Sequence, residues 1–288
     1  DRLRSRGLGD VYKRQTFYSA IKKSNLPASS IDYCFAGDLL NQCISSSFGL
    51  RDLDIPFIGI FGACSTFVEG LGVGSIFIDS GAANNIICGA SSHFCSAEKQ
   101  FRFPLELGNQ RPQSSQWTVT GAGSAILSSN GTGPFITHFT PGKIIDMGIK
   151  DGNNMGAAMA PAALDTLITH LTDTGRKPSY YDAIITGDLG HVGKDILIEL
   201  AQTKGYNIKS NYNDCGVLIF DKETQDTHSG GSGCACCGTV FSGYLFNMLQ
   251  TKKYKKILLI ATGALMNATS SQQGESIPGI AHAISIEV

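Results

Sequence analysis

The sequence lacks any long hydrophobic run. Its apolar stretches are short, such as Ile257 to Ala261, and fall well below the roughly 18 residues that a membrane-spanning helix needs. An excess of charge of one sign is also missing, because 23 basic residues are balanced by 24 acidic ones for a net charge of −1. No long basic run occurs beyond the first fifteen residues, which argues against nucleic acid as the main partner. We therefore expect any membrane attachment to go through partner proteins.

A disulfide framework is not predicted either. The nine cysteines are odd in number and unevenly spaced, and the residues before them do not read as a secretory signal. A reducing compartment fits this pattern better than an oxidising one. At 288 residues with 42% hydrophobic content, the chain can instead bury a large core, as one big domain or as two fused halves.

The first fifteen residues, 1–15, differ from the rest in composition. They show little apolar periodicity and carry five basic residues, namely Arg2, Arg4, Arg6, Lys13 and Arg14. The string resembles translated sequencing-adapter sequence joined to a truncated gene, so we interpret it as a non-native leader. A native disordered basic arm is the alternative. The leader interpretation predicts that this segment has no defined place in the fold and that its deletion leaves thermal stability unchanged.

Two similar segments stand 150 residues apart. Residues 31–39 read I-D-Y-C-F-A-G-D-L and residues 181–189 read Y-D-A-I-I-T-G-D-L, each an apolar strand that ends in Gly-Asp-Leu. A small-residue helix then begins at Cys64 in one case and at Cys236 and Cys237 in the other, and an apolar strand follows each helix. The pattern predicts an internal duplication, with an N-terminal half at residues 16–150 and a C-terminal half at residues 151–288.

The duplication leads to a fold class. Strands that alternate with helices imply mostly parallel sheets covered on both faces, so we predict an α/β fold of two halves in a layered αβαβα arrangement. The helices that begin at Cys64 and Cys237 are apolar or small all round and should therefore lie in the middle. Glycines such as Gly72 and Gly238 cost about 1 kcal/mol each in helix propensity against alanine, so close backbone packing is the expected compensation.

Ordered motifs run through nearly the whole chain from Ile31 to Val288. They are F-G-A-C-S-T, S-S-H, Q-F-R, V-T-G-A-G-S-A, A-M-A-P-A-A, T-G-D-L, N-D-C-G, G-G-S-G-C-A-C and I-P-G-I-A-H. In these motifs the chain resembles the stage V sporulation protein AD family, whose fold is thiolase-like. We expect the N-terminal half to be truncated at its native start. The resemblance implies a sporulation protein that binds dipicolinic acid (pyridine-2,6-dicarboxylate) for its uptake into the developing spore.

The same resemblance implies a location and partners. We expect the protein to lie on the cytoplasmic side of the inner forespore or spore membrane, peripheral to it and without a transmembrane segment. Other membrane proteins of the same sporulation complex would be its partners, and dipicolinic acid would bind free or as its calcium chelate. Thiolase-fold proteins are commonly dimers, so a homodimer is expected as well. No cofactor is implied.

Cys64 is the residue on which any chemistry should depend. It follows an apolar strand and stands at a helix start, where free backbone N–H groups and the helix dipole favour a thiolate or a bound anion. In thiolases and ketosynthases the equivalent cysteine is the acylated nucleophile. The plain structural interpretation is a small buried residue at a tight turn.

The partners that such a nucleophile requires are not evident. The resemblance places the enzymes' histidine just after the strand at residues 181–186, where this chain has Gly187 and Asp188, and His191 comes too late. Ser232 stands in the glycine-rich turn where the enzymes carry Gly-Asn, and His228 fits only with a shifted register. We therefore predict a retained pocket with no confident catalytic residue. An acyltransferase or condensing enzyme that uses Cys64 is the alternative.

A site for dipicolinate needs anion donors at two ends and an apolar slot between them. The turn at Cys64 and Ser65 supplies one set of N–H donors, and His93 and Arg102 are candidates for the other, although a loop histidine and a solvated arginine are equally plain interpretations. The family resemblance adds further ligand-binding candidates, which are Asp214, Cys215 and Ser232. Asp214 would act through a proton, water or calcium, and its plain interpretation is a turn or cap residue.

A cysteine cluster and two strand-end aspartates complete the candidate residues. Cys234, Cys236 and Cys237 suggest a zinc knuckle, but no second cysteine pair at matching spacing is present, so no metal site is predicted. Asp38 and Asp188 end the two duplicated strands and fit helix caps better than ligands.

Overall fold

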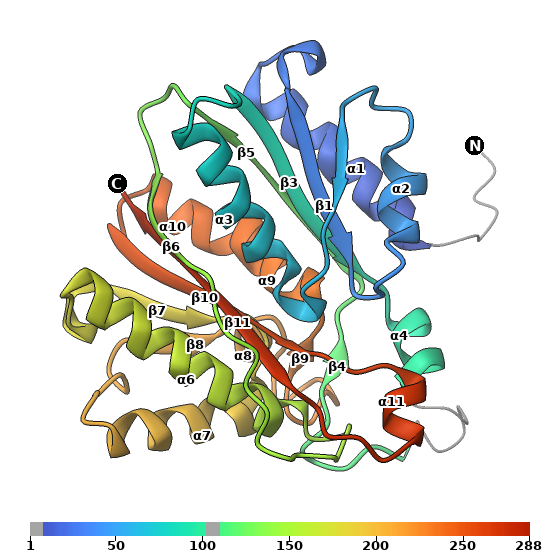
Figure 1. Ribbon diagram of the computed structural model, residues 1–288, viewed down its shortest axis with the longest axis vertical. Coiled ribbons are helices and arrows are strands. Elements are labelled where there is room, and N and C mark those ends of the chain that lie inside the picture. Colours follow the sequence, from blue (N-terminus) through green and yellow to red (C-terminus); the bar gives the residue numbers. More distant parts are fainter. Residues whose placement is uncertain (1–7, 102–109) are drawn as a thin grey trace.

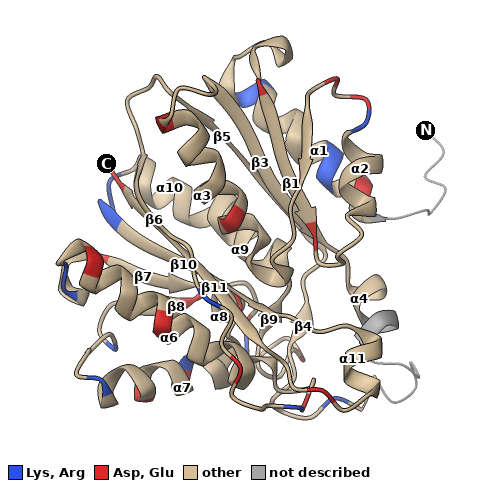
Figure 2. Ribbon diagram, in the orientation of Figure 1, with Lys and Arg blue, Asp and Glu red and all other residues tan. Residues whose placement is uncertain are grey.

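The structure is a computed structural model that describes residues 8–101 and 110–288. Two β-sheets lie one above the other, with helices between them and on both outer faces (Figure 1). Charged side chains lie mainly on the outer helices and loops and are sparse in the central layer (Figure 2). This is the thiolase-like αβαβα arrangement that the alternation of strands and helices predicts.

The first sheet has the strand order β2-β1-β3-β5, formed by Phe57–Gly59, Tyr33–Asp38, Asn85–Ser92 and Gly121–Ser128. β1 runs parallel to both of its neighbours, and β5 is antiparallel to β3. Helices α1 (Leu8–Ser24) and α2 (Ile44–Leu50) belong to this half, and Phe17 and Ile21 of α1 pack with Ile87 of β3 in the outer core of the sheet. Neighbouring residues of β3 face opposite sides of the sheet, so that Ile87 packs in this outer core whereas Ile86 packs in the central one.

The second sheet has the order β6-β11-β10-β7-β8. Its strands are Phe135–Thr140, Gly279–Glu287, Lys256–Ala264, Ala183–Thr186 and Tyr212–Asp214. β7 is parallel to both β10 and β8, whereas β11 is antiparallel to β10 and β6. Helices α6 (Met155–Thr174) and α7 (Gly190–Thr203) cover its outer face, where Leu167 and Leu197 join a second core cluster.

The central layer consists of α3 (Thr66–Asp79), α9 (Cys234–Val240) and α10 (Phe246–Gln250). The π-helical turn η4 (Phe241–Leu245) joins α9 to α10. The rings of Phe67 in α3 and Phe241 lie 5.5 Å apart, in a core cluster that also takes in the inner faces of both sheets. The prediction of two central helices is thus confirmed. Cys64 lies in the 3₁₀ turn η2 (Ala63–Ser65) just before α3, and α9 begins at Cys234, three residues ahead of Cys237.

Glycine allows the backbone approach that the central layer requires. A Cβ on Gly123 of β5 would lie 2.2 Å from the carbonyl carbon of Gly238 in α9, and a Cβ on Gly72 would lie 2.2 Å from the ring of Phe139. Real Cβ contacts are essentially never so short, so a side chain on Gly123 would displace the backbone of α9, and one on Gly72 would displace the ring of Phe139. The helix propensity lost at Gly72 and Gly238 is offset by this packing.

The remaining elements are short and connect the layers. A short parallel pair joins β4 (Trp117–Thr118) to β9 (Gly231–Ser232), so that a strand of the N-terminal half contacts the glycine-rich turn of the C-terminal half. The other elements are α4 (Phe94–Phe101), α8 (Cys215–Leu218), α11 (Ala268–Gln272) and the 3₁₀ turns η1 (Ala28–Ser30) and η3 (Pro178–Tyr180).

Two boundaries differ from those expected. β6 lies before residue 150 but belongs to the second sheet, so by sheet membership the C-terminal half begins at Phe135. Residues 8–15, assigned to the leader by their composition, form the first part of α1. Lys13 is buried there and donates to the Gly37 carbonyl at 2.6 Å, to the Asp38 carboxylate and to Ser46. The predicted lack of a defined place in the fold is therefore wrong for residues 8–15, and residues 1–7 lie outside the described residues.

Candidate functional site

Cys64 lies where the central layer meets the ends of strands from both sheets. The turn that carries it is held tightly: the Ser65 N–H donates to the Gly62 carbonyl at 3.0 Å, and Ala63 adopts a left-handed φ of 52°. β10 packs directly on this turn, because a Cβ on Gly263 would lie 2.4 Å from the Gly62 carbonyl oxygen. The thiol side chain is 4% exposed. The N–H of Ser65 is consequently used within the turn and is not a free donor to a ligand.

A chain of three side chains leads from Cys64 into the second half of the molecule. The sulfur of Cys64 lies 4.0 Å from the hydroxyl of Ser232, which donates to Oδ2 of Asp188 at 3.1 Å. The Gly233 N–H donates to the same oxygen at 2.9 Å, and the hydroxyl of Thr262 donates to Oδ1 at 2.8 Å. Asp188 is therefore a buried carboxylate held by donors from β9, the start of α9 and β10. The three side chains occupy the place that a nucleophile and its two partners would take.

These contacts set the protonation state of the thiol. Burial raises the pKa of Cys64 well above its usual value, and the negative charge and hydrogen bond of Asp188 raise it further. The N–H of Gly233 acts in the opposite direction but is a smaller effect. The expectation that the helix start favours a thiolate is therefore wrong here, because desolvation and a neighbouring carboxylate outweigh the dipole. At neutral pH the thiol is protonated.

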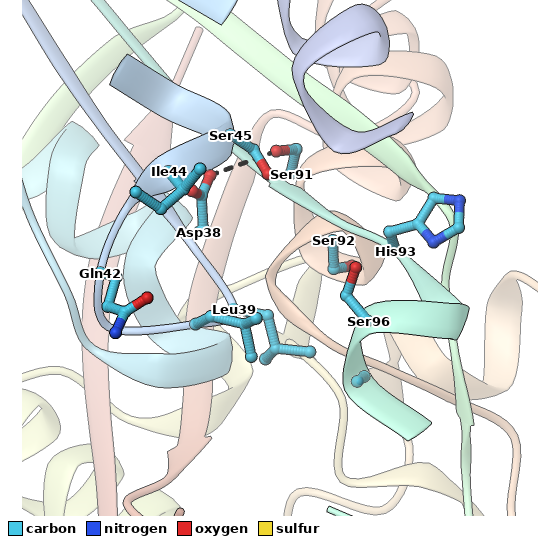
Figure 3. Close-up of a pocket in the computed structure, with 11 residues that line it drawn as sticks. Asp38, Leu39, Gln42, Ile44, Ser45, Ser91, Ser92, His93 and Ser96 are labelled. Atoms are coloured by element: carbon cyan, nitrogen blue, oxygen red, sulfur yellow. Dashed lines mark hydrogen bonds between the residues drawn. The ribbon is translucent and has the colours of Figure 1, made fainter. Parts of the chain in front are cut away.

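The cavity beside Cys64 is small and largely apolar. It has a volume of about 20 Å³ and is lined by Leu39, Ala63, Cys64, Thr118, Ser232 and Met266, among others. We call it the Cys64 cavity. A neighbouring hollow of about 60 Å³ lies at the carboxyl ends of β1 and β3, and we call it the hydroxyl cavity because Ser45, Ser91, Ser92 and Ser96 line it together with Gln42 and His93 (Figure 3). Leu39 borders both cavities.

The predicted binding residues do not all meet at these cavities. Cys64 and Ser232 line the Cys64 cavity, and His93 borders the hydroxyl cavity, where burial lowers the pKa of its half-buried imidazole. The Ser65 hydroxyl donates back to the Gly62 carbonyl at 2.6 Å. Arg102 lies outside the described residues. The roles of these side chains in binding stay predictions.

Asp214 and Cys215 lie deeper, below the floor of the site. Asp214 accepts hydrogen bonds from the Leu189 and Gly190 N–H groups at 2.8 and 2.9 Å and from the Thr186 hydroxyl at 2.7 Å. It also caps α8 through the N–H of Val217, which confirms the plain interpretation of a cap residue. Burial raises its pKa to about 7. Both residues are fully buried, so Asp214 fixes the turn that carries Asp188 and does not border either cavity.

Asp188 belongs to the site, although its position at the end of a strand predicts a helix cap. Its carboxylate is bound by Ser232, Gly233 and Thr262. A signal was present, because Asp188 stands just after the strand where the enzymes carry their histidine. Its counterpart Asp38 does accept from the backbone N–H of Ser46 in α2, at 3.1 Å, as a cap would. The same sequence pattern thus takes different partners in the two halves.

The cysteine cluster after the glycine-rich turn is part of the core. Cys234, Cys236 and Cys237 are fully buried in α9, and the thiol of Cys234 donates to the Ser91 carbonyl at 3.0 Å. Within residues 8–101 and 110–288, no three Cys, His, Asp or Glu side chains gather as metal ligands. We therefore interpret these cysteines as core residues that pack beneath the Cys64 site.

Comparison with known proteins assigns the chain to a family. The family model for stage V sporulation protein AD matches residues 11–287. Stage V sporulation protein AD of Bacillus subtilis (strain 168) is 43% identical over 268 residues, which cover 93% of this chain and 79% of that protein. The chain belongs to the stage V sporulation protein AD family. It is therefore a sporulation protein with a thiolase-like fold.

Solved structures similar to this family member are condensing enzymes. The 3-oxoacyl-[acyl-carrier-protein] synthase III of Aquifex aeolicus VF5 is 15% identical with a TM-score of 0.62, over 96% of this chain and 83% of that one. A structure of Xanthomonas campestris OleA with bound lauric acid and lauroyl-CoA is 11% identical with a TM-score of 0.65, over 96% and 82%. At such identities the likeness establishes the fold alone. In the part of the chain that the structure describes, no helix has the length and apolarity of a membrane span.

Proposed function

We propose that this chain binds dipicolinic acid for its uptake into the developing spore and does not catalyse acyl transfer. Family membership and the motif resemblance support the ligand. The second half of the proposal rests on the side-chain contacts that run from Cys64 through Ser232 to Asp188. Among the described residues, the thiol faces a carboxylate through Ser232 and has beside it neither a histidine to act as general base nor a cation to lower its pKa, so the site retains a pocket without the means to use it for acyl transfer.

The linings of the two cavities suit the chemistry of this ligand. Leu39, Met155 and Met266 offer an apolar slot for an aromatic ring in the Cys64 cavity. Hydroxyl and amide groups of Ser45, Ser96 and Gln42 in the hydroxyl cavity can donate to a carboxylate. The acyltransferase alternative rests on the position of Cys64 and the fold, and its buried, protonated thiol argues against it.

Calorimetric titration with dipicolinate tests the proposal. Titration of wild-type protein with dipicolinate should give a heat of binding that saturates. Cys64→Leu should weaken this binding by about tenfold or more, because the larger side chain fills the Cys64 cavity. Cys95→Leu is the matched control, since Cys95 is an exposed cysteine on α4 and should leave the affinity unchanged. Isophthalate, which lacks the ring nitrogen, and the calcium chelate should be titrated in parallel. Absence of a binding isotherm for wild-type protein with dipicolinate in either form would contradict the proposal.

We further propose that the protein acts on the cytoplasmic side of the inner forespore membrane, held there by membrane proteins of the same complex. Family membership and the absence of a spanning helix among the described residues support attachment through partners. Co-sedimentation with forespore membranes, lost after the partners are removed, is the expected result. Retention on protein-free lipid vesicles would contradict it.

A homodimer is proposed from the free edge of the first sheet. Within residues 8–101 and 110–288, β2 pairs with β1 on one side only, and all three of its residues are exposed. Phe57, Ile58 and Phe61 present large apolar side chains there, 37 to 40% exposed, with Phe48 of α2 beside them at 55%. Two copies of such an edge can pair antiparallel about a twofold axis, which satisfies the open backbone groups of both. Light scattering should give twice the 30.6 kDa mass of the chain, and a monomer mass at micromolar concentration would contradict this interface.

A further inference from the structure

Leu39 occupies an unusual position among the hollows of the molecule. It lines the Cys64 cavity, the hydroxyl cavity and a third, wider hollow of about 230 Å³, formed with Leu40, Phe61 and Met266 and called here the outer hollow. Met266 is shared by the Cys64 cavity and the outer hollow, and Leu40 by the hydroxyl cavity and the outer hollow. Figure 3 shows Leu39 between Gln42 on one side and Ser92 and Ser96 on the other. Of these residues, Leu39 alone borders all three spaces.

The internal duplication supplies a comparison for this residue. Leu189 follows the equivalent Gly-Asp pair in the second half, but it is fully buried in the outer core, and its N–H donates to Asp214 at 2.8 Å. Leu39 is only half-buried and lies in the connection from β1 to α2. Leu189 is therefore fixed in the core of the C-terminal half, whereas the equivalent Leu39 of the N-terminal half lies between hollows.

The connection that carries Leu39 is fixed at both ends. Before it, Asp38 is held by Lys13, by Ser46 and by the Ser91 hydroxyl at 3.4 Å. After it, the thiol of Cys43 donates to the Ile60 carbonyl at 3.4 Å, and the Cys43 N–H donates to the Leu40 carbonyl at 3.2 Å. The Leu39 side chain can change rotamer without breaking any of these bonds. Such changes are fast for a half-buried leucine and leave the fold intact.

Size makes a movement of this kind necessary. A cavity of about 20 Å³ holds roughly one water molecule, whereas a cavity that accepts a ring the size of benzene measures about 150 Å³. Neither the Cys64 cavity nor the hydroxyl cavity can accept an aromatic dicarboxylate by itself. Because Leu39 borders both of them and the outer hollow, it is the side chain whose movement would join the three spaces.

We propose that Leu39 is the gate of the ligand site. In its closed position it separates the Cys64 cavity from the hydroxyl cavity and the outer hollow, and in its open position the spaces join into one elongated site. That site would take a planar aromatic dicarboxylate, with the ring against Met266 and one carboxylate among the hydroxyls of Ser45 and Ser96. The ligand class rests on the proposed function, whereas the gate itself does not.

A readout that needs no ligand tests the gate directly. N-Ethylmaleimide should modify Cys64 slowly in wild-type protein, and Leu39→Ala should speed the modification by about tenfold, because a gate that is open in about a tenth of the molecules limits access by that fraction. Mass spectrometry of the Cys64 peptide distinguishes it from the exposed Cys95. Leu40→Ala is the matched control, since Leu40 borders the other two hollows but not the Cys64 cavity. Equal rates in all three proteins would overturn the gate.

Ligand kinetics form the second arm. Leu39→Ala should raise the association rate constant of dipicolinate about tenfold and admit a larger quinoline dicarboxylate, while Leu39→Phe should lower that rate constant by a similar factor. Thermal unfolding of each variant shows whether it is folded. If Cys64 is modified faster in Leu39→Ala but wild-type protein does not bind dipicolinate, the gate is upheld and the proposed ligand is refuted. Dipicolinate binding that neither Leu39 variant alters, with unchanged Cys64 modification, would uphold the ligand and refute the gate.

Discussion

Replacing Asp188 with asparagine is expected to lower the free energy of unfolding by about 3 kcal/mol and, at the same time, to make Cys64 more reactive. The carboxylate accepts from Ser232, Gly233 and Thr262, all buried. Asparagine has one acceptor oxygen in place of two, so its NH₂ group must face either the Gly233 N–H or the Thr262 hydroxyl, and that buried donor loses its acceptor. Removal of the negative charge also lowers the pKa of Cys64, which raises its rate of alkylation at neutral pH by about three- to fourfold for each unit of decrease, because a tenfold gain in thiolate is partly offset by its lower nucleophilicity.

The two effects are measured separately. Urea unfolding gives the stability, and the pH dependence of iodoacetamide reaction at the Cys64 peptide gives the thiol pKa. Asp38→Asn is the matched control from the other half, because Asp38 is equally buried and hydrogen-bonded but is bound to Lys13 and Ser46. It should destabilise the protein and leave the pKa of Cys64 unchanged. An unchanged Cys64 profile in Asp188→Asn would show that Asp188 does not hold the thiol protonated.

Lys13→Met is expected to cost about 3 kcal/mol in the free energy of unfolding. The change keeps most of the apolar stem but removes the only cation that contacts Asp38 among the described residues, and it leaves that carboxylate buried with hydroxyl and N–H donors alone. Arg14→Met is the control, because the ion pair of Arg14 with Asp52 at 3.6 Å is half-exposed and should contribute less than about 0.5 kcal/mol.

The same measurement on a chain lacking residues 1–15 addresses the leader interpretation. The packing of α1 now predicts a loss of stability at least as large as that of Lys13→Met, in place of the unchanged stability that composition alone suggested. A truncated chain as stable as the full one would restore the earlier expectation and show that the contacts of Lys13 contribute nothing measurable.

Periodicity and repetition predicted the layers of the fold well. The two Gly-Asp-Leu strands, the glycine-rich helices and their central position follow from patterns that are local in the chain. β6 was placed in the wrong half because a strand's sheet is decided by its partner β11, far away in sequence. The start of α1 was missed because the burial of Lys13 depends on Asp38, and a basic residue by itself indicates solvent.

The site was less accessible to sequence reasoning for a related reason. A cysteine at a helix start indicates a thiolate when only the dipole is considered, but the carboxylate of Asp188 comes from the other half of the chain and reverses the effect. The resemblance makes Asp214 a candidate ligand, and the structure adds a role that the sequence does not predict, because its carboxylate accepts four hydrogen bonds that fix the turn carrying Asp188. Which hollow a side chain such as Leu39 borders depends on its rotamer, for which the sequence carries no pattern.

Intact-protein mass spectrometry after incubation with acyl-coenzyme A thioesters tests the central claim most directly. Loss of a general base alone costs about 10² to 10⁴-fold in rate, and the protonated thiol of Cys64 adds to that cost. Acetyl, malonyl and long-chain thioesters should therefore all leave the mass of the protein unchanged, while dipicolinate binds the same sample. A stoichiometric acyl adduct on Cys64 that turns over, in a protein that gives no heat with dipicolinate, would contradict the account and establish a condensing enzyme.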